Sequence, residues 1–357
     1  MHDVEEGLSL DERSAIDFTV RLRWQWAHRV YPALAEQAAS APGEATTLAD
    51  AERLVHEQPI YPWFSAMERL QQKMMWRTAA DTVLRRRREL LDAVDSVCAE
   101  NPDGLLLDPD LALPDWYTDY DIHIQPGSVF TDGASALVYE LGARVVMMRD
   151  NDGYKFHTLF ATTALPELQD ARRVVDIGCG FGKSTRPLCA RYPGAEVIGI
   201  DLSAPNLRLA HAQAVASGLP IVFHQGLGSC TGLPDASVDV VTGTMVLHEM
   251  PATEIEATIQ ECARILRPGG VMRFLEFWPT GEPVRDVTIY EHAERNNEPY
   301  FRDLFGTDTS RVCGQAGLTG HRWATFDERS EGLSPGGYGD RPEWHFPWSV
   351  LCAEKPA

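Results

Sequence analysis

The sequence predicts an α/β fold in which a mostly parallel sheet with helices on both faces follows a helical N-terminal domain. Two observations support this prediction. Apolar residues recur at helical spacing through residues 11–40 and 46–101, and after Asp170 short β-rich runs alternate with helical ones. Such alternation is typical of a parallel sheet, because two parallel strands need a crossover connection between them.

The N-terminal part is predicted to be a helical domain or cap over residues 1–105. Its two helical segments are separated by the breaker Ser40-Ala41-Pro42-Gly43, and Asn101-Pro102-Asp103-Gly104 ends the second. In the first segment the apolar positions at helical spacing are Ile16, Val20, Leu22, Trp26, Val30 and Leu34.

Residues 106–170 are predicted to connect the two parts and to cover the active site. The aromatic and polar run Trp116–Gly127 is expected to be an ordered loop, and Ala134–Met148 and 155–165 are expected to be helices.

Residues 171–357 are predicted to form the sheet and its covering helices. The predicted strands are Val174–Ile177, Val197–Ile200, Val238–Thr242, Val271–Phe277 and Ser349–Ala353. The predicted helices between them are Lys183–Tyr192, Ala204–Ser217 and Thr253–Leu266.

Composition narrows the class of substrate and the compartment. The chain carries 32 basic and 52 acidic residues, and a net charge of −20 disfavours a nucleic-acid partner because the surface repels phosphates. Seven cysteines with no C-x-x-C spacing argue against a disulfide framework and favour a reducing cytoplasm. No signal peptide or membrane span is predicted, so we expect no membrane partner. We also expect a small-molecule substrate and consider a homodimer as the assembly.

A glycine-rich turn follows the first predicted strand of the sheet. The run Val174–Thr185 contains Asp176, Gly178, Gly180 and Gly182 in the pattern D-x-G-x-G-x-G, and glycine lets a ligand approach the backbone closely. A phosphate-binding P-loop is excluded because Ile177 occupies its first glycine position. A nicotinamide fingerprint is disfavoured because Lys183 occupies its third small position.

The second strand ends in an acid at the spacing that a nucleotide site needs. Asp201 lies nineteen residues after Gly182, where a carboxylate can accept both ribose hydroxyls, and Ser203 is predicted to cap the next helix. The alternative is that Asp201 serves only in helix capping.

Together with Gly232–Val241 and Leu266–Gly270, these motifs resemble class I S-adenosylmethionine methyltransferases, specifically the domain of the ubiquinone/menaquinone-biosynthesis type. The resemblance covers about residues 170–280 and the closing strand near Trp348–Ala353. It implies a Rossmann-like seven-stranded sheet and S-adenosyl-L-methionine as cofactor. The residues expected to bind the cofactor are Asp176, Gly178, Cys179, Gly180, Gly182, Asp201, Leu202, Ser229 and Thr244.

Ser229 is a departure from the family pattern. The family usually has an acid at this position, placed to accept from the adenine amino group, and a serine accepts more weakly. Adenine placement is therefore the part of the cofactor site that the resemblance defines least.

Catalytic candidates lie where strands of an open sheet end, because ligands bind beyond the carboxyl ends. His248 is the first choice for a general base because an imidazole titrates near neutrality, and Glu249, Glu276 and His123 are the others. The competing interpretation is that these residues cap helices or order loops. No spacing typical of a metal site is present, so no metal is predicted.

Substrate-lining candidates come from two aromatic and polar segments. Tyr117 and Tyr120 lie upstream of the glycine turn, His292 lies in a lid insertion expected at about 281–310, and Trp278 follows a strand end. The alternatives are a buried polar turn and a solvated helix.

The sequence thus predicts a methyltransferase of secondary metabolism that methylates an oxygen or carbon of a small, partly aromatic or apolar metabolite. Two alternatives stay open at this point. One is an enzyme that binds S-adenosylmethionine but catalyses a rearrangement or elimination, and the other is a catalytically silent binding module.

Overall fold

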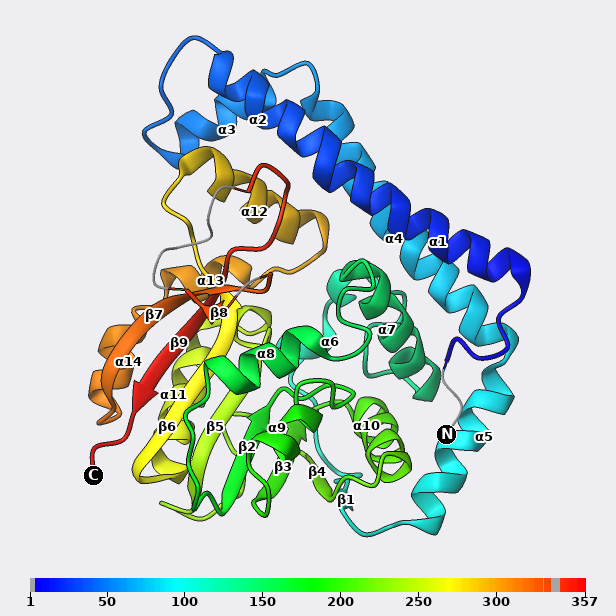
Figure 1. Ribbon diagram of the computed structural model, residues 1–357, viewed down its shortest axis with the longest axis vertical. Coiled ribbons are helices and arrows are strands. Elements are labelled where there is room, and N and C mark those ends of the chain that lie inside the picture. Colours follow the sequence, from blue (N-terminus) through cyan, green and yellow to red (C-terminus); the bar gives the residue numbers. More distant parts are fainter. Residues whose placement is uncertain (1–3, 330, 335–340) are drawn as a thin grey trace.

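The computed structural model describes residues 4–329, 331–334 and 341–357. Its centre is a nine-stranded sheet in the order β1-β4-β3-β2-β5-β6-β9-β7-β8 (Figure 1). Seven strands make up the body of the sheet: β2 (Arg173–Ile177), β3 (Glu196–Asp201), β4 (Ile221–Gln225), β5 (Val238–Thr244), β6 (Leu266–Phe277), β7 (Thr319–Asp327) and β9 (Trp348–Glu354). The two-residue strands β1 (Leu105–Leu106) and β8 (Gly332–Leu333) extend its edges.

The sheet has the Rossmann-like class that the sequence predicts. The strands from β1 to β6 are paired in parallel, and β9 runs antiparallel to both β6 and β7. The chain moves outward from β2 through β3 to β4, then returns to the other side of β2 for β5 and β6. The strand order therefore reverses between β2 and β5, and ligands bind at such a switch point.

Helices cover both faces of the sheet, because successive strand residues point to opposite sides. Val174 packs in the core shared with α8 (Lys155–Thr163), α9 (Arg186–Arg191) and α10 (Ala204–Ala216). Its neighbour Val175 packs in the core shared with α11 (Ala252–Ile265), α13 (Phe301–Gly306) and α14 (Thr309–Gln315). Strands buried on both faces are apolar almost throughout, which is why their sequence signal is strong.

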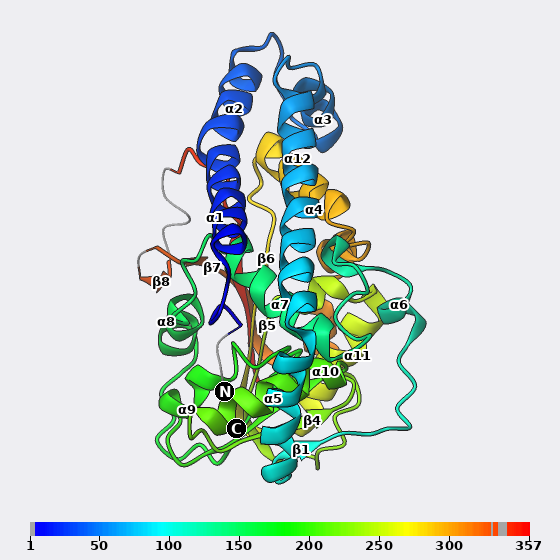
Figure 2. The same cartoon turned by 90° about the vertical axis from the view of Figure 1, so that its right-hand side faces the viewer.

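The N-terminal helices lie across the end of the sheet as a long pair with shorter partners (Figures 1 and 2). They are α1 (Leu10–Gln25), the π-helical turn η1 (Trp26–Val30), α2 (Tyr31–Ser40), α3 (Leu48–His56), α4 (Tyr61–Arg85) and α5 (Arg87–Glu100). The predicted segment 46–101 is thus divided, and one break falls at Pro59, where a helix interior would lose a hydrogen bond. None of the described helices has both the length and the apolar character needed to cross a bilayer.

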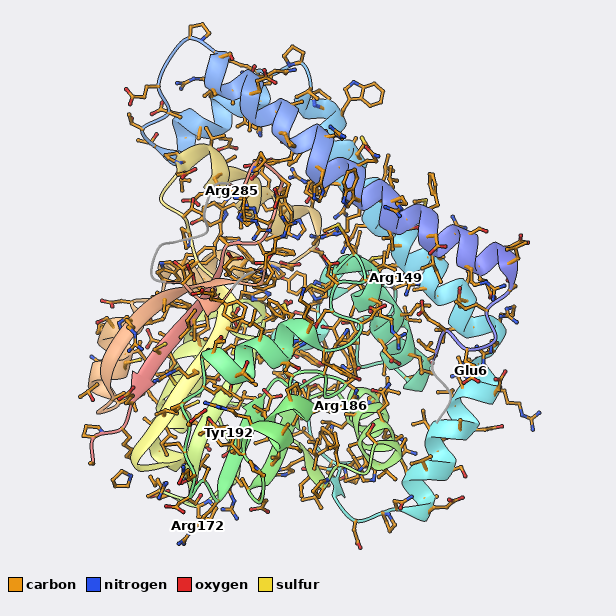
Figure 3. The ribbon with its side chains drawn as sticks, viewed as in Figure 1. Glu6, Arg149, Arg172, Arg186, Tyr192 and Arg285 are labelled. Atoms are coloured by element: carbon orange, nitrogen blue, oxygen red, sulfur yellow. The ribbon has the colours of Figure 1, made fainter. Side chains whose placement is uncertain are left out.

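These helices share one apolar core with the sheet. Trp26 is completely buried; its indole N–H donates to the Phe64 carbonyl at 2.9 Å, and its ring lies 5.0 Å from that of Trp344. All three belong to the same core cluster as Val174. Arg285 of α12 (Pro283–Arg295) borders the same core, with its guanidinium 5.3 Å from the Tyr31 ring and 6.0 Å from the Trp344 ring (Figure 3).

The connecting segment supplies the layer between the N-terminal pair and the sheet. It contains α6 (Asp115–Thr118), the short 3-10 turn η2 (Ile122–Ile124) and α7 (Gly133–Val146), and α7 packs on both α4 and α10. The predicted helices Ala134–Met148 and 155–165 are confirmed as α7 and α8.

The close approach of α4 and α7 gives a test of this packing. A Cβ added at Gly142 would lie 2.1 Å from the Trp76 ring, so Gly142→Ala should lower the free energy of unfolding by about 1–3 kcal/mol. Gly314→Ala is the matched control, because Gly314 also lies in a helix but has nothing within 4 Å of an added Cβ. It should be neutral or stabilise by up to about 1 kcal/mol. Urea denaturation measures both, and equal effects would contradict the described packing.

Candidate functional site

The three glycines after β2 serve three different purposes. Gly178, Gly180 and Gly182 all have positive φ angles, of 67°, 51° and 78°. A Cβ at Gly178 would lie 2.2 Å from the Val246 side chain, and one at Gly182 would crowd α10. At Gly180 the space is open, with a Tyr139 ring atom 3.8 Å away, so this glycine leaves the backbone accessible to a ligand.

Asp176 holds this turn in place through hydrogen bonds to two hydroxyl groups that follow it. Its Oδ2 accepts hydrogen bonds from the hydroxyls of Ser184 and Thr185, both at 2.7 Å, and burial raises its pKa to about 6. Asp176 is fully buried and does not line the cavity described below, so it is seen to hold the turn, and its direct contact with a cofactor stays a prediction. Cys179 is likewise buried, and its Sγ would lie 2.9 Å from a Cβ on Gly199.

Asp201 lies at the end of β3, facing the glycine turn. Its Oδ2 accepts from the Gly180 N–H and its Oδ1 from the Ser203 N–H, both at 2.8 Å. Burial raises the pKa of this carboxyl group. Each carboxylate oxygen can accept more than one hydrogen bond, so both retain capacity for a ligand donor. Ser203 caps α10 as predicted, because its hydroxyl oxygen accepts a hydrogen bond from the Asn206 N–H.

A cavity, here called the first cavity, opens beside Asp201 at the switch point of the sheet. Of the residues expected to bind a cofactor, Gly178, Gly180, Asp201 and Leu202 line it. Its other walls are Trp116, Tyr117, Ile122, His123, Val129, Tyr139, Ile177, Ile200, Asn206, Gly226, Leu227, Gly228, Met245, Val246, Glu249, Met250 and Glu254.

Ser229 does not line this cavity, contrary to expectation. Its hydroxyl donates to Oε1 of Glu254, and Glu254 itself reaches the cavity wall from α11. The acid at the expected adenine end therefore comes from another element. Gly182 and Thr244 also lie outside the cavity lining: Gly182 packs against Phe223, and Thr244 is buried.

Glu276 fixes the turn that follows β5. It is completely buried on β6; its Oε1 accepts from the backbone N–H groups of Val246 and Leu247 at 2.7 and 2.6 Å. Its Oε2 lies 2.6 Å from Nδ1 of His248. Glu276 lines neither the first cavity nor the one described next, and its role as a base stays a prediction. It positions the turn, in which Met245 has a left-handed φ of 55°.

A second cavity adjoins the first and extends towards the N-terminal helices. Both are lined by His123, Tyr139, Met245 and Glu249, a set called the junction below. The remaining walls of the second cavity are Arg23, Gln72, Trp76, Ala143, Val146, Met147, His248, Phe277, His292, Asn296, Glu298, Phe346 and Trp348.

Two histidines and two glutamates form a paired cluster at the junction. His123 Nε2 lies 3.3 Å from Glu249 Oε1 and its Nδ1 lies 3.0 Å from Glu298 Oε1. His248 Nε2 lies 3.4 Å from the same Glu249 oxygen. The Oε2 atom of Glu249 has no hydrogen-bond partner, so one acceptor at the junction is unused.

The charges of this cluster follow from its pairing. Burial works to lower the pKa of His123, but Glu249 and Glu298 outweigh it and raise that pKa. For His248 burial is likewise outweighed by Glu276 and Glu249, and the pKa lies well above its usual value. Burial would raise the pKa of Glu249, yet His123 and His248 lower it. The pairing therefore favours protonated imidazoles beside an ionised Glu249 carboxylate.

The same cluster contains ligand types that a metal ion could use. Ligand atoms of His123, Glu249 and Glu298 lie within 4.8 Å of one another, and no other group of this kind occurs in residues 4–329, 331–334 and 341–357. The sequence predicted no metal because these residues come from distant segments. The imidazole already stands between the two carboxylates, so the cluster balances charge without an ion.

Of the four residues expected to line a substrate pocket, two line one of these cavities and two do not. Tyr117 lines the first cavity and His292 lines the second. Tyr120 and Trp278 line neither: the Tyr120 ring meets that of Tyr300 edge-on, and Trp278 stacks on Trp323 with centroids 4.1 Å apart. Local aromatic content identified the segments, but packing against partners far along the chain decides which ring faces a cavity.

Sequence reasoning missed several residues that line the two cavities. Tyr139 lies on α7, Glu298 follows α12, and Arg23 lies on α1. A signal for Arg23 existed, since it falls on the buried stripe of α1 with Ile16 and Thr19. Nothing local distinguished Glu298.

Comparisons with known proteins agree with the motifs. Residues 174–270 match the family model described as "Methyltransferase domain", which confirms the class predicted for this segment. The demethylmenaquinone methyltransferase of Thermus thermophilus is 34% identical over 108 residues, 30% of this chain and 48% of that protein. The trans-aconitate 2-methyltransferase of an Azoarcus species is 39% identical over 105 residues, 29% of this chain and 39% of that protein. The chain thus spans about half or less of the length of these relatives.

Among solved structures, phosphoethanolamine N-methyltransferase 2 of Haemonchus contortus is similar with a TM-score of 0.43 and 15% identity. The likeness covers 56% of this chain and 52% of that one. The strand order described above, rather than this likeness, defines the fold.

The paired cluster predicts a pH dependence of stability. Because the folded-state pKa of His123 is raised, its pairing stabilises the fold fully below pH of about 6.5 and is lost as pH rises through the raised pKa. His123→Asn, which tolerates the left-handed φ of 59°, should therefore destabilise most at pH 6, by about 1–2 kcal/mol. Urea denaturation at pH 6, 7, 8 and 9 measures the difference from wild type. A difference that grows with pH would overturn this assignment of charges.

Proposed function

We propose that this chain, whose residues 174–270 form a methyltransferase domain, transfers a methyl group from S-adenosylmethionine to an oxygen or carbon of a small, partly aromatic or apolar metabolite. The observation that carries the proposal is the junction. A cavity beside the glycine turn and Asp201 meets a second, largely aromatic cavity at His123, Tyr139, Met245 and Glu249.

The first cavity suits the cofactor. Asp201 has unused acceptor capacity for the ribose hydroxyls, and Gly180 leaves the backbone open beside it. Glu254 is placed to accept from the adenine amino group, the role expected at first of Ser229. When bound, S-adenosylmethionine supplies an electrophilic methyl group and a thioether leaving group.

The junction provides the groups that the acceptor needs. Tyr139 and Met245 form apolar walls that hold the acceptor in line and keep water away. The unused Oε2 of Glu249 can take the proton of an acceptor hydroxyl as methyl transfer makes that hydroxyl strongly acidic, and His123 and His248 hold the carboxylate in place. In this proposal Glu249 is the base, whereas His248 is held by Glu276 and acts through Glu249.

In this proposal each of the three parts of the chain has its own role. Residues 1–105 act as a cap that contributes α1 and α4 to the second cavity, and residues 106–170 bring His123 and Tyr139 to the junction. Residues 171–357 bind the cofactor, with a lid at about 281–310 that contributes His292 and Glu298.

Composition bears on the substrate class and on the cellular compartment. A net charge of −20 supports a small-molecule substrate rather than a nucleic acid. All seven cysteines are free, which supports a cytoplasmic location. A role in secondary metabolism and a homodimeric assembly stay predictions.

The cofactor assignment is tested by binding. Asp201→Ala should weaken binding of S-adenosylmethionine at least about tenfold, because the ribose hydroxyls lose their acceptor. Asp170→Ala, an exposed acid next to β2 that lines no cavity, is the matched control and should bind as wild type does. Isothermal titration calorimetry measures both. Equal affinity in wild type and Asp201→Ala would remove the assignment.

The base is tested by turnover. Glu249→Gln should lower kcat by about 10²–10⁴-fold while cofactor affinity stays within about threefold, because proton transfer is lost and cofactor contacts remain. The assay incubates protein, labelled cofactor and a metabolite extract, and follows the methylated product and S-adenosylhomocysteine by mass spectrometry. Full turnover in this variant would show that Glu249 is not the base. A changed extract without S-adenosylhomocysteine would instead favour the non-methylating alternative.

A further inference from the structure

Arg23 is a buried cation with almost no partner. It lies in the last turn of α1, just before the π-helical turn, and is only 4% exposed. Its Nη1 donates to Oε1 of Gln72 at a long 3.4 Å. Within the described part of the chain no carboxylate oxygen lies within the 4.0 Å of an ion pair with its guanidinium.

Such an arrangement is costly unless a counter-ion is present at some stage. The acid whose charge acts on Arg23 is Glu68, but the two form no ion pair; the Glu68 carboxylate instead pairs through Oε1 with His292 Nδ1 and through Oε2 with Arg295 Nε. Burial lowers the pKa of Arg23 to about 10, and Glu68 opposes that effect only in part. Arg23 therefore stays cationic at neutral pH, with several N–H donors unused.

Those donors face the second cavity at the end away from the junction. Arg23 lines the second cavity and also a third one, which it shares with Val146, Met147, Phe346 and Trp348. No residue of the third cavity lines the first. The second cavity thus has a methyl-transfer end at the junction and a cationic end at Arg23.

Between these ends the cavity is built for a flat, apolar molecule. Its walls include Trp76, Phe277, Phe346 and Trp348. Asn296, only 1% exposed, also lines it, and its Oδ1 has no hydrogen-bond partner. A ligand in this cavity could therefore donate a hydrogen bond to Asn296 in addition to pairing with Arg23.

We propose that the methyl acceptor is an aromatic carboxylic acid, whose carboxylate pairs with Arg23 while its nucleophilic atom reaches the junction. This inference rests on the proposed function. A planar guanidinium binds a carboxylate through two parallel hydrogen bonds, and a low-dielectric aromatic cavity strengthens that pairing. Gln72 orients the guanidinium for it.

The test compares acids with their uncharged amides. Benzoate, phenylacetate, cinnamate, 3-(4-hydroxyphenyl)propanoate and indole-3-acetate are each titrated beside the corresponding primary amide into full-length protein saturated with S-adenosylhomocysteine. We expect wild type to bind at least one acid about tenfold or more tightly than its amide. Arg23→Gln should abolish that preference without changing the affinity for S-adenosylhomocysteine, and Arg23→Lys should retain part of it.

Arg21→Gln is the matched control, because Arg21 is an exposed arginine on the same helix and lines neither the first nor the second cavity. It should keep the wild-type preference. The inference is overturned if no acid outbinds its amide with wild type, or if Arg23→Gln keeps the preference. If Arg23→Gln fails to fold, the acid-over-amide preference of wild type and its reduction in Arg23→Lys still test the inference. Failure of S-adenosylhomocysteine to bind wild type would count against the proposed function instead.

Discussion

The arrangement of the site depends on one buried carboxylate, Glu276. An unpaired oxygen on a buried acid is costly, and Glu276 avoids this cost by accepting from two successive backbone N–H groups and by pairing with His248. The turn after β5 is thereby fixed. Its Val246 packs where a side chain on Gly178 would stand, and its Glu249 reaches His123. The cofactor cavity and the junction are therefore set by the same side chain.

The second constraint is that the second cavity, in which we propose that the acceptor binds, is built mostly outside the matched domain. Arg23 and Trp76 come from the N-terminal helices, Tyr139 from α7 and Asn296 from the segment after α12. Because α2, α3, α4 and α12 contribute to one core with the sheet, the cap is packed onto the rest of the molecule. The similarity over residues 174–270 therefore bears on cofactor binding. In our proposal the identity of the acceptor depends mainly on the rest of the chain.

Local signals predicted the parts of the fold that local physics determines. The strand-and-glycine run from Val174 and the acid at Asp201 were predictable because turn geometry and double-sided burial restrict sequence strongly. β4 and β7 were not among the predicted strands, because β4 ends in polar His224 and Gln225 and β7, near the sheet edge, is only partly buried. The residues at the junction, such as Glu298 opposite His123, were not predictable together, because only tertiary packing joins segments 175 positions apart. Ser229 and Glu254 show the same limit, since motif position pointed to the serine and the fold presents the glutamate.

The central claim is that Asp201 and the glycine turn bind an adenosyl sulfonium compound whose reacting end faces the junction. A crystal structure of the full chain with S-adenosylhomocysteine tests it most directly. The account predicts ribose hydroxyls within about 2.5–3.2 Å of the Asp201 carboxylate and the sulfur directed towards Met245 and His123. An adenosyl group bound elsewhere, or the first cavity closed by side chains in the complex, would contradict it.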